Sequence, residues 1–197
     1  AYHSLRRFET EVLSMATWML NGDSNVAGTL TSGGTESVLM AVKTYRDRAR
    51  KLCPHITTPN MIAPITIHPA FEKAALSRGL PLHVDACFGG FMMPWLEKLG
   101  CKIPLWDFRV KGVTSISADI HKYGYCPRGA SVVLYRNAEL RAHQFFAYPS
   151  WPGGLFGSPA MAGSRPGGMI AAAWTAMVAM GQEGYMNIAS KVLEVTK

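Results

Sequence analysis

A lysine beside a histidine, His121-Lys122, follows one short apolar run of this chain, and a second apolar run ends at Asp85. A solitary lysine is usually a solvated charge, and an aspartate after a strand is often only a helix cap. Together, however, an amine and a carboxylate can serve pyridoxal 5′-phosphate (PLP), which needs an amine for a Schiff base and a carboxylate to keep its pyridine nitrogen protonated. Lys122 and Asp85 are therefore candidate cofactor residues.

Both candidates follow predicted strands, which should bring them to one edge of a sheet. Residues 80–85 and 112–117 are short apolar runs typical of buried strands. Open α/β sheets bind ligands at the carboxyl ends of such strands. We therefore expect Asp85 and the His121-Lys122 pair to meet around one ring.

A glycine-rich turn, TLTSGGTES, precedes an amphipathic helix. Gly33 and Gly34 permit a tight turn and close approach of the backbone, while Thr35 and the free N–H groups of the first helical turn suit a phosphate. The alternative is a simple helix cap by Ser32 or Thr35, with Glu36 favoured at the positive helix end. The turn is not a Walker loop, because no Gly-Lys-Ser/Thr follows at the needed spacing.

A further candidate, His68, follows the apolar run MIAPITI and precedes Pro69, which restricts its backbone to extended or turn geometry. A histidine there could stack on the pyridine face and help to transfer protons. It could equally be a hydrogen-bonded histidine of no special role.

Five segments together resemble the sphingosine-1-phosphate lyases, within the PLP-dependent group II decarboxylase family of the aspartate-aminotransferase fold. They are TSGGTES, HPAFEKAA, HVDACFGGF, DFRVKGVTSISADIHKYGY and AGSRPGG. The resemblance extends from about residue 5 to residue 185. It implies an α/β protein of PLP-dependent transferase fold type I, in which a large domain has a mostly parallel central sheet flanked by helices.

The resemblance implies a role for each motif residue. Lys122 would form the Schiff base, Asp85 would pair with the pyridine nitrogen, and His68 would stack over the ring, so these three are the expected catalytic residues. The groups around the cofactor phosphate would be Gly34, Thr35, His121 and, from the neighbouring subunit of a homodimer, Ser164.

Two residues depart from the family pattern. Arg128 stands where relatives carry a lysine that serves the substrate phosphate, and its positive charge suits the same role although a guanidinium is broader and planar. Phe156 stands where a tyrosine is familiar, so a hydroxyl is absent.

The resemblance implies a PLP-dependent aldehyde-lyase of the sphinganine-1-phosphate aldolase type. Such an enzyme cleaves the C2–C3 bond of sphingosine 1-phosphate, or of a related long-chain base phosphate, to a fatty aldehyde and phosphoethanolamine. The nearer alternative is a PLP-dependent amino-acid decarboxylase of the same fold group, which needs a cationic pocket for an α-carboxylate. The remoter one is a binding protein without catalysis.

Composition favours a globular protein with anionic ligands. Hydrophobic residues make up 48% and charged residues 17% of the 197-residue chain, whose formal charge is +7. The basic residues are scattered and no nucleic-acid motif occurs, so we expect a phosphorylated small molecule rather than nucleic acid as partner. The four cysteines lack CxxC or Cys/His metal spacing, which predicts reduced thiols and no metal site.

No apolar stretch reaches the roughly 18 residues needed to span a bilayer. Since bacterial members of the family that this chain resembles are soluble, the resemblance implies a cytoplasmic, bacterial-type protein that meets membranes only through its lipid substrate. An upstream anchor outside this chain would instead place it at the endoplasmic reticulum. We expect residues 1–197 to form one PLP-binding large domain, without its N-terminal segment and C-terminal small domain. Few residues separate predicted strands 61–67 and 80–85, so a crossover segment is expected to be missing near residues 75 and 76.

Periodicity predicts the remaining elements. Helices are expected at 3–20, 35–51, 92–99 and 168–180, and strands at 61–67, 80–85, 112–117 and 130–135. The stretch 148–168 is rich in proline, glycine and aromatic residues and is expected to be irregular, as an ordered active-site loop at the subunit interface. The alternative is a flexible connection.

Overall fold

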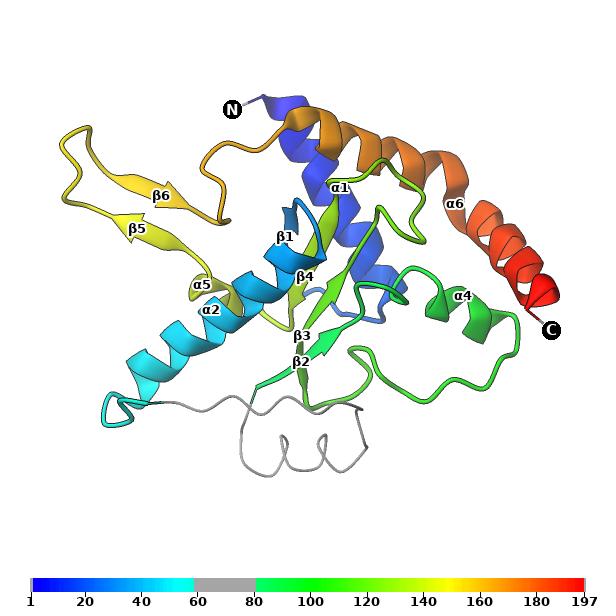
Figure 1. Ribbon diagram of the computed structural model, residues 1–197, viewed down its shortest axis with the longest axis horizontal. Coiled ribbons are helices and arrows are strands. Elements are labelled where there is room, and N and C mark those ends of the chain that lie inside the picture. Colours follow the sequence, from blue (N-terminus) through cyan, green and yellow to red (C-terminus); the bar gives the residue numbers. More distant parts are fainter. Residues whose placement is uncertain (1, 59–80, 197) are drawn as a thin grey trace.

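The computed structural model describes residues 2–58 and 81–196 (Figure 1). His68, the predicted strand at 61–67 and the expected missing segment near residues 75 and 76 lie outside the described residues.

A four-stranded sheet in the order β1-β4-β3-β2 forms the centre of the molecule. The strands are β1 (Ala27–Thr31), β2 (Leu82–Asp85), β3 (Val113–Ala118) and β4 (Ser131–Tyr135). Strand β2 pairs parallel with β3, whereas β4 runs antiparallel to both β1 and β3, so β1, β2 and β3 share one direction. The mixed sheet with three codirectional strands confirms the expected α/β architecture. Strand β1 is not predicted from the sequence, because AGTLT contains only one large apolar residue, Leu30.

The side chains of β4 alternate between two cores, one on each face of the sheet. Val132 and Leu134 belong to the larger cluster, which α1 (His3–Met19) and α6 (Gly167–Val195) cover. Val133 and Tyr135 pack instead against α2 (Gly34–Leu52), which crosses the other face (Figure 1). The sheet is therefore covered on both faces, so a ligand can reach it at the ends of its strands.

The predicted helices are confirmed, with one difference at α6. This helix continues past the predicted end at residue 180, but Gly181 interrupts it with a φ of 55°, a conformation that favours glycine. Helix α4 (Met93–Lys98) was predicted, whereas the short α5 (Ala138–Ala142) was not. Helix α5 begins after Asn137, whose side chain accepts a hydrogen bond from the Leu140 N–H.

A β-hairpin extends away from the body of the molecule (Figure 1). It pairs β5 (Phe146–Tyr148) with β6 (Phe156–Ser158), so the expectation that 148–168 is irregular throughout is wrong for these strands. Tyr148 is paired with Phe156 across the two strands, and the ring of Phe146 also lies near that of Phe156. Such cross-strand aromatic contacts stabilise a hairpin. Its aromatic side chains are exposed, namely Phe146, Tyr148, Trp151 and Phe156.

Among the described helices, none is long and apolar enough to cross a bilayer.

Candidate active site

The ends of β2 and β3 meet the first turn of α2. Asp85 is the last residue of β2, and the turn after β3 carries His121 and Lys122. A Cβ atom on Gly34 would lie 2.7 Å from Cys87 Sγ and 2.9 Å from Asp119 Oδ2, and one on Gly33 would lie 3.4 Å from His121 Cε1. The glycine turn is therefore in direct contact with both strand ends, and only glycine fits at residue 34 without displacing them.

Asp85 presents one oxygen to the protein and leaves the other available. Its Oδ1 accepts hydrogen bonds from the Cys87 N–H at 3.0 Å and the Ser117 hydroxyl at 3.3 Å. Oδ2 has no hydrogen-bond partner among the described residues. Partial burial raises the pKa of Asp85, but hydrogen bonds from Cys87 and Ser117 outweigh this effect and hold the pKa below its ordinary value. The carboxylate is therefore charged at neutral pH.

A chain of hydrogen bonds runs from Ser115 through His83 and Ser117 to Asp85. His83 Nε2 lies 3.2 Å from Ser117 Oγ, and His83 Nδ1 lies 2.8 Å from Ser115 Oγ. Because Ser117 donates its proton to Asp85, it accepts from His83, which assigns the hydrogen of the ring to Nε2. Burial lowers the pKa of His83 to about 4, so the ring is neutral at physiological pH.

His83, Ser115 and Ser117 are not among the site residues predicted from the sequence, although a signal for them is present. His83 and Asp85 are two residues apart on one strand, and Ser115 and Ser117 are two apart on its parallel neighbour. Residues at this spacing point to the same face of a sheet. Polar side chains at alternate positions of two adjacent buried strands thus indicate a polar network behind the candidate carboxylate.

Cys87 is buried beside this network and is not suited to nucleophilic chemistry. Its thiol donates to Ser117 Oγ at 3.2 Å. Burial raises the pKa of the Cys87 thiol well above its ordinary value, and the nearby Asp85 raises it further. The thiol therefore stays protonated and acts as a small hydrogen-bond donor.

Lys122 and His121 share a buried carboxylate that the sequence analysis also missed. The Lys122 Nζ atom lies 3.0 Å and the His121 Nε2 atom 3.4 Å from Asp119 Oδ2. His121 Nδ1 accepts a hydrogen bond from the Ala130 N–H, so the protein engages both ring nitrogens. The interaction with Asp119 raises the pKa of Lys122, which is therefore an ammonium in this structure. Its side chain is 38% exposed and accessible to a ligand.

The start of α2 offers free donors, as expected for a phosphate site. The first backbone hydrogen bond of the helix runs from the Ser37 N–H to the Gly33 carbonyl, so the N–H groups of Gly34 and Thr35 have no helical partner. The simple helix cap is not observed, because Gly33 is the N-cap and makes no side-chain hydrogen bond. Ser32 instead donates to Glu36 Oε2 through both its N–H and its hydroxyl.

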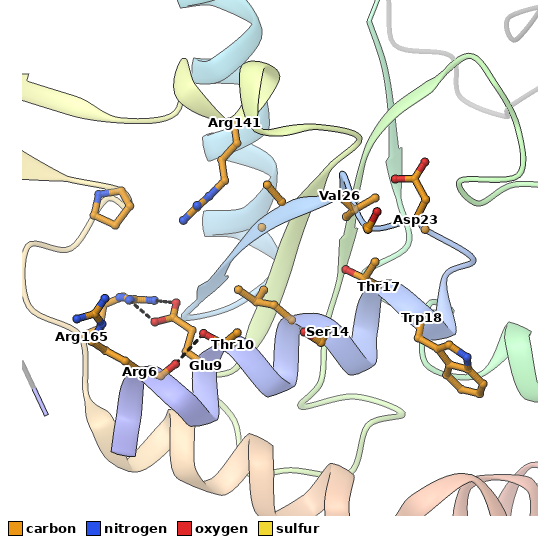
Figure 2. A pocket seen from close by; sticks show the side chains of 16 residues that line it. Arg6, Glu9, Thr10, Ser14, Thr17, Trp18, Asp23, Val26, Arg141 and Arg165 are labelled. Carbon is orange, nitrogen blue, oxygen red and sulfur yellow. Dashed lines mark hydrogen bonds and ion pairs between the residues drawn. The ribbon is translucent and has the colours of Figure 1, made fainter. Parts of the chain in front are cut away.

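The AGSRPGG loop is fixed to the body by the residue after Ser164. Arg165 donates to Glu9 Oε2 at 2.7 Å (Figure 2). It also donates to the Leu30 carbonyl at 2.9 Å. Ser164 itself is exposed, and its hydroxyl makes no hydrogen bond to the described part of the chain. Arg128 is likewise exposed and has no ion-pair partner among those residues.

A groove with a volume of about 680 Å³ lies between α1 and β1, apart from the candidate site (Figure 2). Arg6, Asp23 and Arg141 are among its lining residues, and the ion pair of Glu9 and Arg165 lies at one end. It contains none of the residues predicted for the cofactor. The candidate site is thus recognised by its chemistry rather than by the size of its cavity.

Comparison with known proteins assigns the chain to a family. Residues 58–197 match the pyridoxal-dependent decarboxylase conserved domain. The chain belongs to the pyridoxal-dependent decarboxylase family. The cofactor of this family is PLP, which confirms the cofactor predicted from Lys122 and Asp85.

Within the family, the chain is similar to sphingosine-1-phosphate lyases. The lyase of Dictyostelium discoideum is 40% identical over 253 residues, covering 100% of this chain and 47% of that protein. The solved structure of a Burkholderia pseudomallei lyase matches with a TM-score of 0.89 and 37% identity over 97% of this chain and 58% of that one. Lactobacillus brevis glutamate decarboxylase, at 20% identity over 98% of this chain and 59% of that one, shares the fold with a TM-score of 0.74. The chain spans about half the length of the curated relative.

Proposed function

We propose that this chain is the PLP-binding large domain of a carbon–carbon lyase that cleaves long-chain base 1-phosphates, such as sphingosine 1-phosphate, between C2 and C3. The products are a fatty aldehyde and phosphoethanolamine. The observation that carries the proposal is the meeting of Asp85, Lys122 and the Gly34 turn at one edge of the sheet.

The residues at this edge fit PLP. Asp85 has a charged carboxylate with Oδ2 available for a pyridine N–H, Lys122 offers an accessible amine, and the N–H groups of Gly34 and Thr35 suit the phosphate. We assign the cofactor to these four residues, with His121 and the partner's Ser164 as further phosphate ligands and His68 over the ring.

Relatedness supports a lyase rather than a decarboxylase. Identity is 40% to the Dictyostelium lyase and 37% to the Burkholderia lyase, but 20% to the glutamate decarboxylase. The alignment with the Dictyostelium lyase spans 253 residues, more than the 197 of this chain, so that relative contains segments that this chain lacks. This supports the inference that a family segment is missing near residues 75 and 76.

PLP, when bound, supplies the electron sink that makes the bond beside the substrate amine breakable. The chain supplies orientation, charge and protons. Asp85 holds the proton on the ring nitrogen, and Arg128 binds the substrate phosphate. A base removes the proton of the C3 hydroxyl, the C2–C3 bond breaks, the aldehyde departs and C2 takes up a proton. Lys122 and His68 are the two candidates for moving these protons.

We place the active site at the interface of a homodimer. The exposed aromatic hairpin of β5 and β6 presents the type of apolar surface that marks protein interfaces. The loop that holds Ser164 begins directly after this hairpin, and the Ser164 hydroxyl makes no hydrogen bond to the described residues of its own chain. Both features support a Ser164 that completes the partner's site.

The test is a product assay with the full-length enzyme and PLP. One arm contains sphingosine 1-phosphate and measures hexadecenal, and the other contains glutamate or aspartate and measures carbon dioxide. Aldehyde without carbon dioxide supports the lyase, whereas carbon dioxide alone supports the decarboxylase. Lack of any PLP absorbance would instead favour a catalytically silent protein.

A further inference from the structure

We propose that Asp119 is a positioning residue that holds the amine of Lys122 and the imidazole of His121 against the glycine turn before the cofactor arrives. The inference deepens the proposed function, because it takes Lys122 as the cofactor-binding amine. Its test requires no cofactor, however, so it can fail or succeed independently of that function.

Local geometry brings the three side chains together. The Lys122 N–H donates to the Asp119 carbonyl at 3.3 Å, which closes a tight turn directly after β3. The turn folds Lys122 back so that Nζ lies 3.0 Å from Oδ2, and it places His121 Nε2 3.4 Å from the same oxygen. One carboxylate oxygen thus fixes two adjacent side chains that are both predicted to contact the cofactor.

The Asp119 side chain is buried beside these partners. Only 2% of the residue is exposed, and Oδ1 has no hydrogen-bond partner among the described residues. An unpaired buried carboxylate is strongly unfavourable, so Lys122, His121 and the positive end of α2 at Gly34 must compensate it. Gly34 permits this arrangement, since a Cβ there would lie 2.9 Å and 3.0 Å from the two oxygens.

The pairing controls when Lys122 can react. The contact with Asp119 raises the pKa of Lys122 and outweighs the opposing effect of partial burial. The other ionisable groups that act on this amine are Asp85 at the end of β2 and Cys87 just after it, and His121 faces the same carboxylate. An ammonium must lose a proton before it attacks a carbonyl. The proton passes to solvent, to which the partly exposed side chain of Lys122 has access: an N–H bond breaks, water or hydroxide gains the proton, and the Nζ lone pair becomes available.

Competitive labelling of the cofactor-free protein tests the proposal. Limiting acetic anhydride is added at a series of pH values, and mass spectrometry measures acetylation of Lys122 relative to N-acetyl-lysine in the same tube. Only the neutral amine reacts, so the profile reports its titration. In Asp119→Asn, the Lys122 midpoint should move to lower pH. A midpoint lower by about one pH unit corresponds to about tenfold more labelling at pH 8.

Asp47→Asn is the matched control. It removes the carboxylate of another lysine ion pair, that of Lys43 and Asp47 on α2, whose atoms lie 3.0 Å apart. This variant should leave the Lys122 profile unchanged, which shows that the effect belongs to Asp119 rather than to any lost negative charge.

Two results would overturn the proposal. The first is a folded Asp119→Asn protein, with unchanged circular dichroism, whose Lys122 profile superimposes on that of the unaltered protein. The second needs no variant: Lys122 of the unaltered protein should titrate above the N-acetyl-lysine standard, and a midpoint at or below the standard contradicts the ion pair even if Asp119→Asn does not fold.

Discussion

The Ser117 hydroxyl lies 3.3 Å from Asp85 Oδ1, across two adjacent parallel strands in which these residues are paired in register. The register of β2 and β3 therefore decides which side chain supports the carboxylate. Ser117 and the Cys87 N–H both bond to Oδ1, whereas Oδ2 has no partner among the described residues and is available to a ligand.

Asp85→Asn keeps the size of the side chain but deletes the charge that holds a pyridine proton. In the full-length enzyme we expect kcat to fall on the order of 10²-fold or more, while KM changes little, because the lost interaction matters most in the transition state. Ser117→Ala removes one hydrogen bond and should reduce kcat only about fivefold. Steady-state kinetics measures both, and unchanged turnover in Asp85→Asn with PLP bound would reject Asp85 as the ring partner.

Lys122→Ala should abolish covalent cofactor attachment without preventing folding, because His121 and the positive end of α2 still compensate the buried Asp119. After incubation with PLP and borohydride, the unaltered protein should gain one reduced cofactor on Lys122 by mass spectrometry, and the variant none there. Turnover of the full-length variant should fall to background. Lys111→Ala, which alters an exposed lysine, serves as the control. Normal activity of Lys122→Ala with an adduct on another lysine would contradict the assignment.

The stability of the folded chain should depend on pH through His83. Burial lowers the pKa of His83 to about 4, whereas an unfolded histidine titrates near 6.5. Between these values the unfolded state binds a proton and the folded state does not, so stability present above about pH 6.5 is lost as pH falls toward 4. The loss from this residue is at most about 3 kcal/mol.

Urea unfolding at pH 7 and pH 4.5 measures that loss. In His83→Gln the difference in unfolding free energy between the two pH values should shrink, whatever the absolute stability of the variant. His55→Gln, at an exposed histidine, should keep the full difference. Equal pH dependence in the His83 variant and the unaltered protein would show that His83 is not buried in its neutral form.

Arg128 should contribute to substrate affinity through charge. It is exposed in the turn between Lys122 and β4, with no ion-pair partner among the described residues. Arg128→Ala should raise KM for sphingosine 1-phosphate about tenfold, the effect of losing a charged hydrogen bond, while Arg128→Lys should retain most affinity. Arg50→Ala, at an exposed position of α2, should not change KM. If Arg128→Ala also leaves KM unchanged, another group binds the substrate phosphate.

Subunit complementation tests the shared active site. Full-length Lys122→Ala and Ser164→Asp homodimers should each be inactive, since a carboxylate beside the cofactor phosphate loses a hydrogen bond and adds repulsion. After mixing and subunit exchange, one site of each heterodimer combines an intact lysine with an intact loop, so about a quarter of the original activity should return. Absence of rescue, with exchange verified by mass spectrometry, would show that both residues act within one chain.

The sequence by itself determined the local elements and the two principal candidates. Apolar periodicity predicted α1, α2 and the strands that end near Asp85 and Lys122, because each pattern lies within one short segment. The rule that ligands meet parallel strands at their carboxyl ends then placed both candidates at one edge. The family followed from motifs that span nearly the whole chain.

Only the tertiary structure decided which groups support those candidates. Asp119 can be recognised as a site residue only from its contact with Gly34, which lies far away in the sequence. The hydrogen-bonded link from His83 to Asp85 likewise depends on the register of β2 against β3. The sequence predicts an irregular segment at the aromatic hairpin, because its two strands have only three residues each and the prolines and glycines around them are typical of loops. Periodicity reports burial within one element, whereas the charge state of Lys122 and the orientation of Asp85 result from contacts between elements, which one-dimensional spacing does not encode.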